Sequence, residues 1–365
     1  MATKKTMKAK PKQIVYLLGA GATQAEVNYL GAAPVNLLMR DSELGKGLST
    51  GILEKLGAKG LPFLATDLGV DIEKLISLLA ASGVDSQLSL AERMRKLYFQ
   101  EICSRLTKSK IIRRPELGIG LLEMHTNVKF RAQVESLEAI LTTNHDGLLQ
   151  LASQKVFGAV DIGFPFTSDD LTPNGSTPVP PILQLHGSFG WKFGVPLRAT
   201  TLKRGYKYSP NTMWIPPTVL KESKNYPFNK IHGLAYEILA KRCDVLRVIG
   251  ASLTQNDWNV LCLIFNAQRH RELVRGAPFL IEFIMSRRSG EEIQANCSYL
   301  KNMFPINHLS QGDFSGYEED VLPAESELRN SFAYWLREKV TYHLRRDEFD
   351  LPISRAMAQI AGDTV

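Results

Sequence analysis

The amino-acid sequence predicts an α/β fold, with a Rossmann-like parallel sheet and a helical insertion. Four apolar, β-type runs each end in small or polar residues, and stretches with helical spacing lie between them. In a parallel α/β sheet, the carboxyl ends of the strands line the crevice where ligands bind. We therefore expect the four segments at these ends to lie together, and they are residues 17–23, 141–146, 184–188 and 248–253.

The first strand is predicted at residues 13–18, where the first apolar run lies. Gly19 and Gly21 then permit a tight turn, and Thr23 is placed to cap the helix that follows. From about residue 66 to 135, apolar residues recur mostly at helical spacing. We expect this block to be a helical insertion between the first and second strands.

The alternation of strands and helices resumes after the insertion. The elements predicted there are a strand at residues 137–142, a helix at 147–155, strands at 180–186 and 244–249, helices at 234–241 and 257–268, a strand at 279–285 and a terminal helix at 325–345. We divide the chain into a basic flexible tail (residues 1–12), one large domain (13–325) and a C-terminal helical extension (326–365).

Composition and charge predict a cytoplasmic globular protein. The contents of 44% apolar and 22% charged residues are ordinary for that class. No apolar run approaches the roughly 18 residues of a membrane span, and the stretch after the basic tail is too short for a signal-peptide core. The five lysines of residues 1–12 account for most of the net charge of +7, so any direct contact with nucleic acid is expected to be weak.

The cysteines and histidines do not follow a metal-binding pattern. The four cysteines lie far apart without a C-x-x-C pair, which argues against a zinc ribbon and gives no disulfide framework. The histidines also lack the spacing of metal ligands. We therefore expect no bound metal.

An amide and an acid follow the strand predicted at residues 137–142. Asn144 and Asp146 stand at its end, directly after Thr143. An amide side chain orients a ribose hydroxyl or a water without being ionised. One of the two residues is also expected to cap the next helix, and His145 between them is expected to point away from the site.

A histidine ends the strand predicted at residues 180–186. Gly187 follows His186 and leaves its ring free to face the crevice. Because the pKa of histidine lies near neutrality, His186 suits general-base work on a ribose hydroxyl or a water. The alternative is a hydrogen-bonded histidine of the core.

Two glycine-containing turns complete the predicted crevice. The segment Gly19-Ala20-Gly21 lets the backbone approach a pyrophosphate, whose charge the N-terminus of the next helix stabilises. Gln24 stands where the full dinucleotide fingerprint has its third glycine, so a simple tight turn is the alternative. Gly250 and Ser252 fit contact with ribose or phosphate, and an ordinary strand-to-helix turn is the alternative there.

Taken together and in this order, these residues resemble the sirtuin-like family. Its members share a glycine-alanine-glycine turn, a threonine-rich segment ending in Asn-x-Asp, a histidine-glycine strand end and a later glycine-x-serine turn. Classical sirtuins carry four zinc-binding cysteines between the histidine and the glycine-x-serine segments, where this chain has only Cys243. The resemblance is therefore to the zinc-free, helix-inserted bacterial branch, which is similar to NAD-hydrolysing effectors of antiphage defence.

The resemblance implies an NAD+ hydrolase that cleaves the nicotinamide–ribose bond and releases nicotinamide and ADP-ribose. In that mechanism Asn144 places the water and the ribose hydroxyls, His186 acts as the base, and Asp146 holds the ribose or Asn144 in position. NAD+ is the substrate, and the residues implied to bind it are Gly19, Ala20, Gly21, Thr23, Thr143, Gly250 and Ser252.

Unrestrained NAD+ hydrolysis is toxic, so the resemblance also implies a gate. The gate would be homo-oligomerisation or a partner such as a HerA-type ATPase or another defence sensor, and no membrane is involved. Three alternatives remain open: a catalytically silent NAD- or ADP-ribose-binding regulatory subunit, a zinc-free protein deacylase, and a nucleic-acid-binding subunit.

Overall fold

The computed structural model describes most of the chain between residues 10 and 284. The described residues are 10–29, 35–56, 72–111, 114–163, 179–192, 208–218 and 221–284, apart from 43, 210, 222, 252 and 254, together with Phe332, Ala333, Trp335, Leu336 and Lys339. Residues 1–9 of the predicted tail, Ser252 and most of the predicted C-terminal extension lie outside this set.

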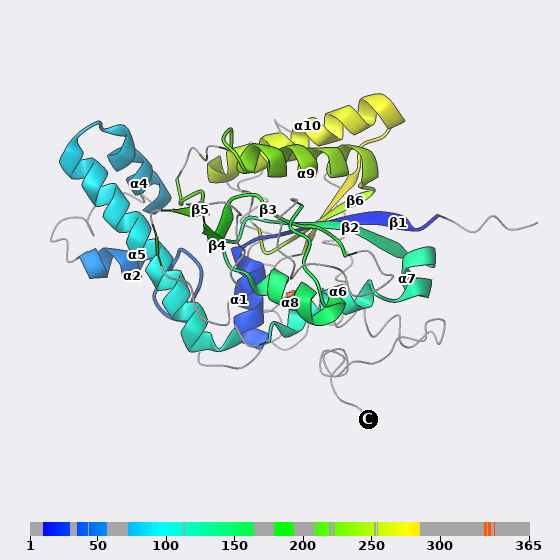
Figure 1. Ribbon diagram of the computed structural model, residues 1–365, viewed down its shortest axis with the longest axis horizontal. Helices are drawn as coiled ribbons and strands as arrows, with labels where there is room; N and C mark the ends of the chain where they lie inside the picture. The colour runs from blue at the N-terminus through cyan, green and yellow to red at the C-terminus, as the bar shows by residue number, and fades with distance from the viewer. Residues whose placement is uncertain are drawn as a thin grey trace, which may run out of the picture.

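Five parallel strands form the central sheet (Figure 1). They are β1 (Lys12–Leu18), β2 (Glu135–Thr142), β3 (Ile182–Gln184), β6 (Val245–Ile249) and β7 (Leu280–Ile284). Their spatial order is β3-β2-β1-β6-β7, so the strand order reverses between β1 and β6. This reversal is the topological switch point of a Rossmann-like sheet. The predicted α/β class with a parallel sheet is confirmed.

The strands end level with one another along one edge of the sheet. Leu18 at the end of β1 is paired in register with Thr142 of β2 and with Ile249 of β6. Thr142 is in turn paired with Gln184 of β3. The four segments singled out in the sequence therefore leave the sheet at the same carboxyl edge.

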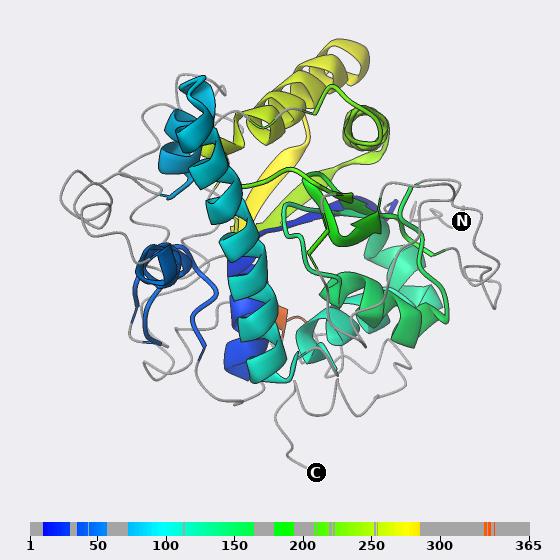
Figure 2. The same cartoon turned by 60° about the vertical axis from the view of Figure 1, so that its left-hand side comes forward.

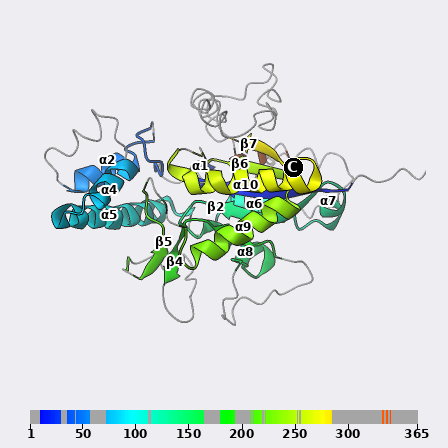
Figure 3. The ribbon, with the colours of Figure 1, turned by 90° about the horizontal axis from the view of Figure 1, so that it is seen from above.

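Helices cover both faces of the sheet (Figures 1 and 3). The helices on one face are α9 (Phe228–Arg242) and α10 (Trp258–Arg275), and those on the other are α1 (Ala20–Tyr29), α6 (Glu116–Met124) and α8 (Leu148–Phe157). Val15 and Leu17 of β1 enter the core beneath α9 and α10, whereas Ile14, Tyr16 and Leu18 enter the opposite core. Burial on both faces explains why β1 is a continuous apolar run.

Three further helices form a unit at the carboxyl edge of the sheet. They are α2 (Leu48–Leu56), α4 (Ile72–Ala81) and α5 (Asp85–Ser109), and they pack on a core of their own that includes Ile52, Ile76 and Met94. Figures 1 and 2 show this unit at one end of the molecule, with α5 passing beside α1. With α6 and α7 (Val128–Gln133), these helices stand between β1 and β2 in the chain.

The third strand is shorter than predicted. β3 ends at Gln184 instead of residue 186, and Leu185 and His186 form a turn. The cause is Gly187, whose φ of +75° turns the chain into β4 (Gly187–Lys192). β4 pairs with β5 (Thr212–Trp214) in a separate antiparallel sheet. His186 therefore lies in a turn between two sheets and not at the end of a strand.

Three helices differ from the prediction by three residues or more at one end. Because α1 begins at Ala20, Thr23 lies inside this helix and does not cap it. α9 begins at Phe228 instead of residue 234. α10 continues to Arg275 and ends at Gly276, whose φ of +76° suits the left-handed C-terminal position. Among the described helices, none combines the length and apolar character needed to cross a bilayer.

A buried arginine joins three strands to the C-terminal part of the chain. Arg247 of β6 donates two hydrogen bonds of 2.6 Å to Glu135 of β2 and another of 2.6 Å to Glu282 of β7. Its guanidinium carbon lies 5.6 Å from the ring centroid of Trp335. Since a buried charge without a partner is strongly destabilising, these two acids allow Arg247 to occupy the otherwise apolar β6.

The turns after β1 and β6 meet backbone to backbone. A Cβ atom added to Gly19 would lie 2.6 Å from Ala251 Cα, and one added to Gly21 would lie 2.8 Å from Gly250 Cα. A Cβ atom on Gly250 would lie 2.2 Å from the Ala22 amide nitrogen. The three glycines are therefore required by the close approach of the two turns.

Gly250→Ala is expected to lower the free energy of unfolding by at least about 2 kcal/mol, because φ here is +61° and the methyl group would overlap Ala22. Gly233→Ala is the matched control. Gly233 lies within α9 with no atom near its added Cβ, so alanine should raise stability by about 0.5–1 kcal/mol. Urea unfolding measures both effects, and a Gly250→Ala variant as stable as the wild type would contradict the contact.

Candidate functional site

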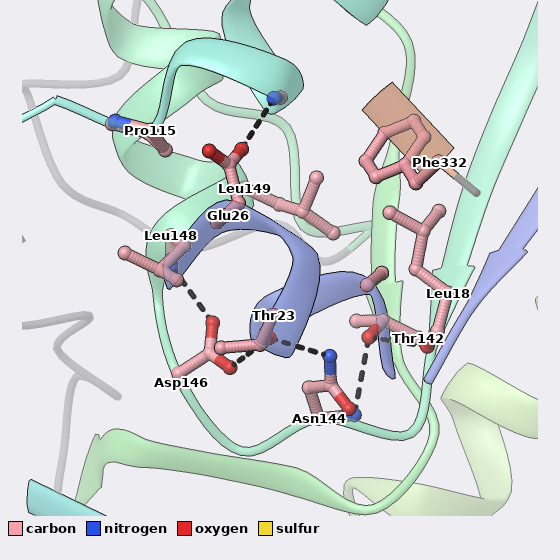
Figure 4. A pocket seen from close by; sticks show the side chains of 12 residues that line it. Leu18, Thr23, Glu26, Pro115, Thr142, Asn144, Asp146, Leu148, Leu149 and Phe332 are labelled. Carbon is pink, nitrogen blue, oxygen red and sulfur yellow. Dashed lines mark hydrogen bonds between the residues drawn. The ribbon is translucent and has the colours of Figure 1, made fainter. Parts of the chain in front are cut away.

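Asn144 is held at the carboxyl edge through both of its side-chain N–H groups, and Figure 4 shows the bond to Thr23. Asn144 Nδ2 donates to the carbonyl oxygen of Gly19 at 2.8 Å and to Thr23 Oγ1 at 2.9 Å. The backbone N–H of Asn144 donates to Thr142 Oγ1 at 3.1 Å. Because both amide donors are used, Oδ1 is the side-chain atom with which Asn144 can accept a further hydrogen bond.

Asp146 continues this chain of hydrogen bonds. Thr23 Oγ1 donates to Asp146 Oδ2 at 2.9 Å, and the Leu148 N–H at the start of α8 donates to Oδ1 at 3.1 Å. Burial raises the pKa of Asp146, while the hydrogen bonds from Leu148 and Thr23 act to lower it. Asp146 therefore accepts from the first N–H of α8, although Gly147 and not Asp146 or Asn144 occupies the N-cap position. Thr23 connects Asp146 to Asn144.

The backbone N–H groups of the glycine turn donate hydrogen bonds to other backbone groups of the protein. The Gly19 N–H donates to the Ile249 carbonyl at 3.0 Å, and the Gly21 N–H donates to the Gly250 carbonyl at 2.8 Å. The N–H of Ala22 donates back to the Gly19 carbonyl at 2.9 Å. The Gly19 and Gly21 amides thus hold the turn against the end of β6, and the Ala22 amide closes the turn on itself. The positive N-terminal end of α1 is the feature of the turn that favours an anion.

A cavity of about 20 Å³ lies between α1, α6 and α8 (Figure 4). This volume holds one water molecule. The polar residues of its wall are Thr23, Glu26, Thr142, Asn144 and Asp146, and the apolar ones include Leu18, Ala22, Leu149 and Phe332. The wall thus brings Asn144, Asp146 and Thr23 together, and His186 is not part of it.

Glu26 is a buried carboxyl group that the sequence analysis did not single out. Its carboxylate accepts hydrogen bonds from the backbone N–H groups of Leu117, at 3.1 Å, and Gly118, at 2.5 Å, in the first turn of α6. Burial raises the pKa of Glu26 to about 8, against the opposing effect of these two hydrogen bonds. The one sequence feature that marks it is an acid within the mostly apolar stretch of α1.

His186 is nearly fully buried, with 3% of its surface exposed. Burial holds its pKa well below the ordinary value, and the ammonium group of Lys221 acts in the same direction. The imidazole is therefore neutral at pH 7. A backbone hydrogen bond with Thr143 places the ring beside the residue that precedes Asn144.

Lys221 belongs to a charged cluster at the same edge, which sequence reasoning also missed. Its side chain is 5% exposed, and Nζ donates to Asp257 Oδ1 at 2.7 Å and to the Asn256 carbonyl at 2.9 Å. Glu73 of α4 lies 3.7 Å from Nζ and accepts a hydrogen bond of 2.6 Å from Asn256 Nδ2. This cluster joins the three-helix unit to the turn before α10. Its members lie far apart in the sequence, so no local pattern marks them.

His145 is buried among aromatic rings from α5, β4 and β5. Its ring centroid lies 5.1 Å from that of Phe189, 5.2 Å from that of Trp214 and 6.4 Å from that of Tyr98. Burial also lowers the pKa of His145, to about 3. His145 is thus a neutral part of the packing between the three-helix unit and the small sheet.

In the described part of the chain, no group of three or more His, Cys, Asp or Glu side chains is arranged to hold a metal ion. Ser252 of the predicted glycine-x-serine turn lies outside the described residues. The sequence matches no family model, and no curated protein gives a significant match.

The raised pKa of Glu26 predicts that the contribution of this residue to stability decreases as the pH rises. Between about pH 4.5 and 8 the folded protein keeps a proton on Glu26 that the unfolded chain has lost. The contribution of Glu26 to the free energy of unfolding is therefore present below about pH 4.5 and is lost as the pH approaches 8.

Glu26→Gln stays uncharged and should make the stability curve from urea unfolding shallower across this window. Glu237→Gln, at an exposed position of α9, is the control and should leave the slope unchanged. Equal slopes for Glu26→Gln and the wild type would contradict the assignment.

Proposed function

We propose that this protein is a sirtuin-like NAD+ hydrolase, which breaks the bond between nicotinamide and ribose and releases nicotinamide and ADP-ribose. One observation carries this proposal. The Asn144 amide, the Asp146 carboxyl group and the glycine turn of β1 are joined by hydrogen bonds at the switch point of a Rossmann-like sheet. Nucleotides bind at this point in sheets of this kind.

Cleavage of this bond requires few catalytic groups from the protein. The C–N bond breaks first, its electron pair leaves with nicotinamide, and the ribose carbon becomes oxocarbenium-like. Nicotinamide departs as a neutral molecule, so no strong general acid is needed. Water then forms the new C–O bond and loses one proton.

Each of the three side chains has a role that fits its surroundings. Asn144 Oδ1 accepts a hydrogen bond from the attacking water or from a ribose hydroxyl, since both N–H groups of this amide are used. Asp146 acts through Thr23 and fixes the orientation of Asn144. His186 is neutral and buried, and it accepts the proton only as water adds to the cationic sugar.

The cavity beside Asn144 has the volume of about one water molecule, the nucleophile of the reaction. Because unrestrained NAD+ hydrolysis is toxic, we propose that cleavage is gated, with homo-oligomerisation or a partner protein such as a HerA-type ATPase as the trigger. Depletion of NAD+ in antiphage defence is the corresponding cellular role.

Incubation of the full chain with NAD+ should yield nicotinamide and ADP-ribose in equal amounts, measured by chromatography. Asn144→Ala and His186→Ala should each lower the rate by about 100-fold or more, because they remove the group that orients water and the base. Matched controls are Asn266→Ala and His270→Ala, both on α10, and these should keep the wild-type rate. Thermal melting verifies that all four variants fold.

Binding of NAD+ is measured in parallel by calorimetry. Both measurements are repeated at protein concentrations at which the chain self-associates, because homo-oligomerisation is a proposed trigger. Binding without cleavage under all these conditions would favour the regulatory-subunit alternative over the hydrolase. Equal cleavage by the wild type, Asn144→Ala and His186→Ala would overturn the assigned roles, and absence of both binding and cleavage under all these conditions would overturn the proposed function.

A further inference from the structure

Exposed cations gather at the amino edge of the sheet, where the parallel strands begin and which lies opposite the candidate site. The start of β1 and the ends of α9 and α10 all lie at this edge (Figure 1). Five exposed basic residues of these segments make up what we call the amino-edge surface: Lys10, Lys12, Lys241, Arg242 and Arg275. Three further lysines precede Lys10 in the sequence, and residues 1–12 contain no acid.

Hydrogen bonds join the three segments into one surface. The Asp244 N–H donates to the Gln13 carbonyl at 2.7 Å, and the Leu280 N–H donates to the Asp244 carbonyl at 3.0 Å. The Arg275 guanidinium donates to the Lys241 carbonyl and so connects the end of α10 to the end of α9. Residues far apart in the sequence therefore present their charges side by side.

The acids beside the amino-edge surface do not neutralise it. Asp244 is ion-paired with Arg271 of α10, and Glu237 is ion-paired with Lys241. The other four basic residues of the surface have no ion pair with any described acid. A cation in the last turn of a helix stabilises the helix dipole, which accounts for the position of those on α9 and α10 but not for Lys10 and Lys12. The excess of positive charge favours an acidic partner.

Exposed aliphatic side chains lie beside these cations. Leu273 and Val274 in the last turn of α10 are 83% and 69% exposed, and Leu280 at the start of β7 is 42% exposed. A protein interface buries apolar side chains inside a polar rim, whereas nucleic acid is bound chiefly through its phosphates. Peripheral membrane surfaces commonly present Trp or Phe. The large exposed aromatic residues of the described chain, Tyr226 and Trp258, lie instead near the starts of α9 and α10.

We propose that the amino-edge surface docks an acidic segment of a partner protein. Carboxylates of that segment pair with the cations that begin β1 and end α9 and α10, and its apolar side chains cover Leu273 and Val274. Because this edge is opposite the one that carries Asn144, the docked partner leaves the candidate site uncovered. The inference needs no NAD+ and goes beyond the proposed hydrolysis.

A labelled peptide of repeated Glu-Glu-Leu triplets is the probe, and its binding to the full chain is measured by fluorescence anisotropy. We expect the peptide to bind at low salt and to bind more weakly as the salt concentration rises, because exposed charges are screened. A peptide of Glu-Glu-Ser triplets has the same charge and no apolar side chains. Its dissociation constant should be about threefold higher or more.

Two pairs of matched variants locate the binding surface. Arg242→Glu should raise the dissociation constant of the Glu-Glu-Leu peptide about tenfold or more, because repulsion replaces attraction. Lys230→Glu makes the same change in net charge at an exposed position near the start of α9, and it should have little effect.

Leu273→Ser should raise the same constant about threefold, whereas Leu78→Ser, at a 64% exposed position of α4, should leave it unchanged. Thermal melting verifies that all four variants fold.

Duplex DNA and phosphatidylglycerol vesicles are the competing probes. Tighter binding of the chain to either of them than to the peptide, lost in Arg242→Glu, would overturn the assignment of a protein partner. Absence of peptide binding by the wild type, or equal effects of Arg242→Glu and Lys230→Glu, would overturn the docking surface itself. None of these measurements involves NAD+, so their outcome is separate from that of the proposed function.

Discussion

The close contact between the turns after β1 and β6 is the constraint that organises the carboxyl edge. The peptide groups of Gly19, Gly21 and Gly250 lie in van der Waals contact, and hydrogen bonds from the first two glycines fix their distance. This contact sets the start of α1 at Ala20 and thereby the position of Thr23, one turn into the helix. Thr23 is then in reach of both Asn144 and Asp146.

The polar groups at the end of β2 are held in two different ways. Asn144, Thr23 and Asp146 form a connected series of hydrogen bonds, which fixes the amide before any ligand arrives. Such prior orientation is what an active site needs, because the protein does not have to reorganise during the reaction. His186 stands apart from this series, as a buried neutral ring that hydrogen-bonds the backbone of Thr143. The amide is thus oriented independently of the histidine.

The sequence predicted the parts of the fold that depend on local patterns. The sequence predicted β1, β2, β6 and β7 because buried parallel strands are short apolar runs. It also predicted that the polar strand ends lie together, since parallel strands in register end at the same edge of the sheet. The end of β3 was wrong, since the reversal at Gly187 depends on its fit against Met213 and Trp214 of β5. Arg247, Lys221 and Glu26 were not anticipated. Their partners come from distant elements, and a charged residue in an apolar run carries no local indication of what will neutralise it.

The three-helix unit of α2, α4 and α5 has a consequence for access to this edge. The unit packs on a hydrophobic core of its own, and supersecondary units of this kind often open as one in proteins. Its polar connection to the turn before α10 is the cluster of Glu73, Lys221 and Asn256. If a ligand needs this connection to open, the fraction of molecules in which it is released multiplies the intrinsic affinity for that ligand. The strength of one ion cluster would then enter the apparent dissociation constant as a conformational equilibrium.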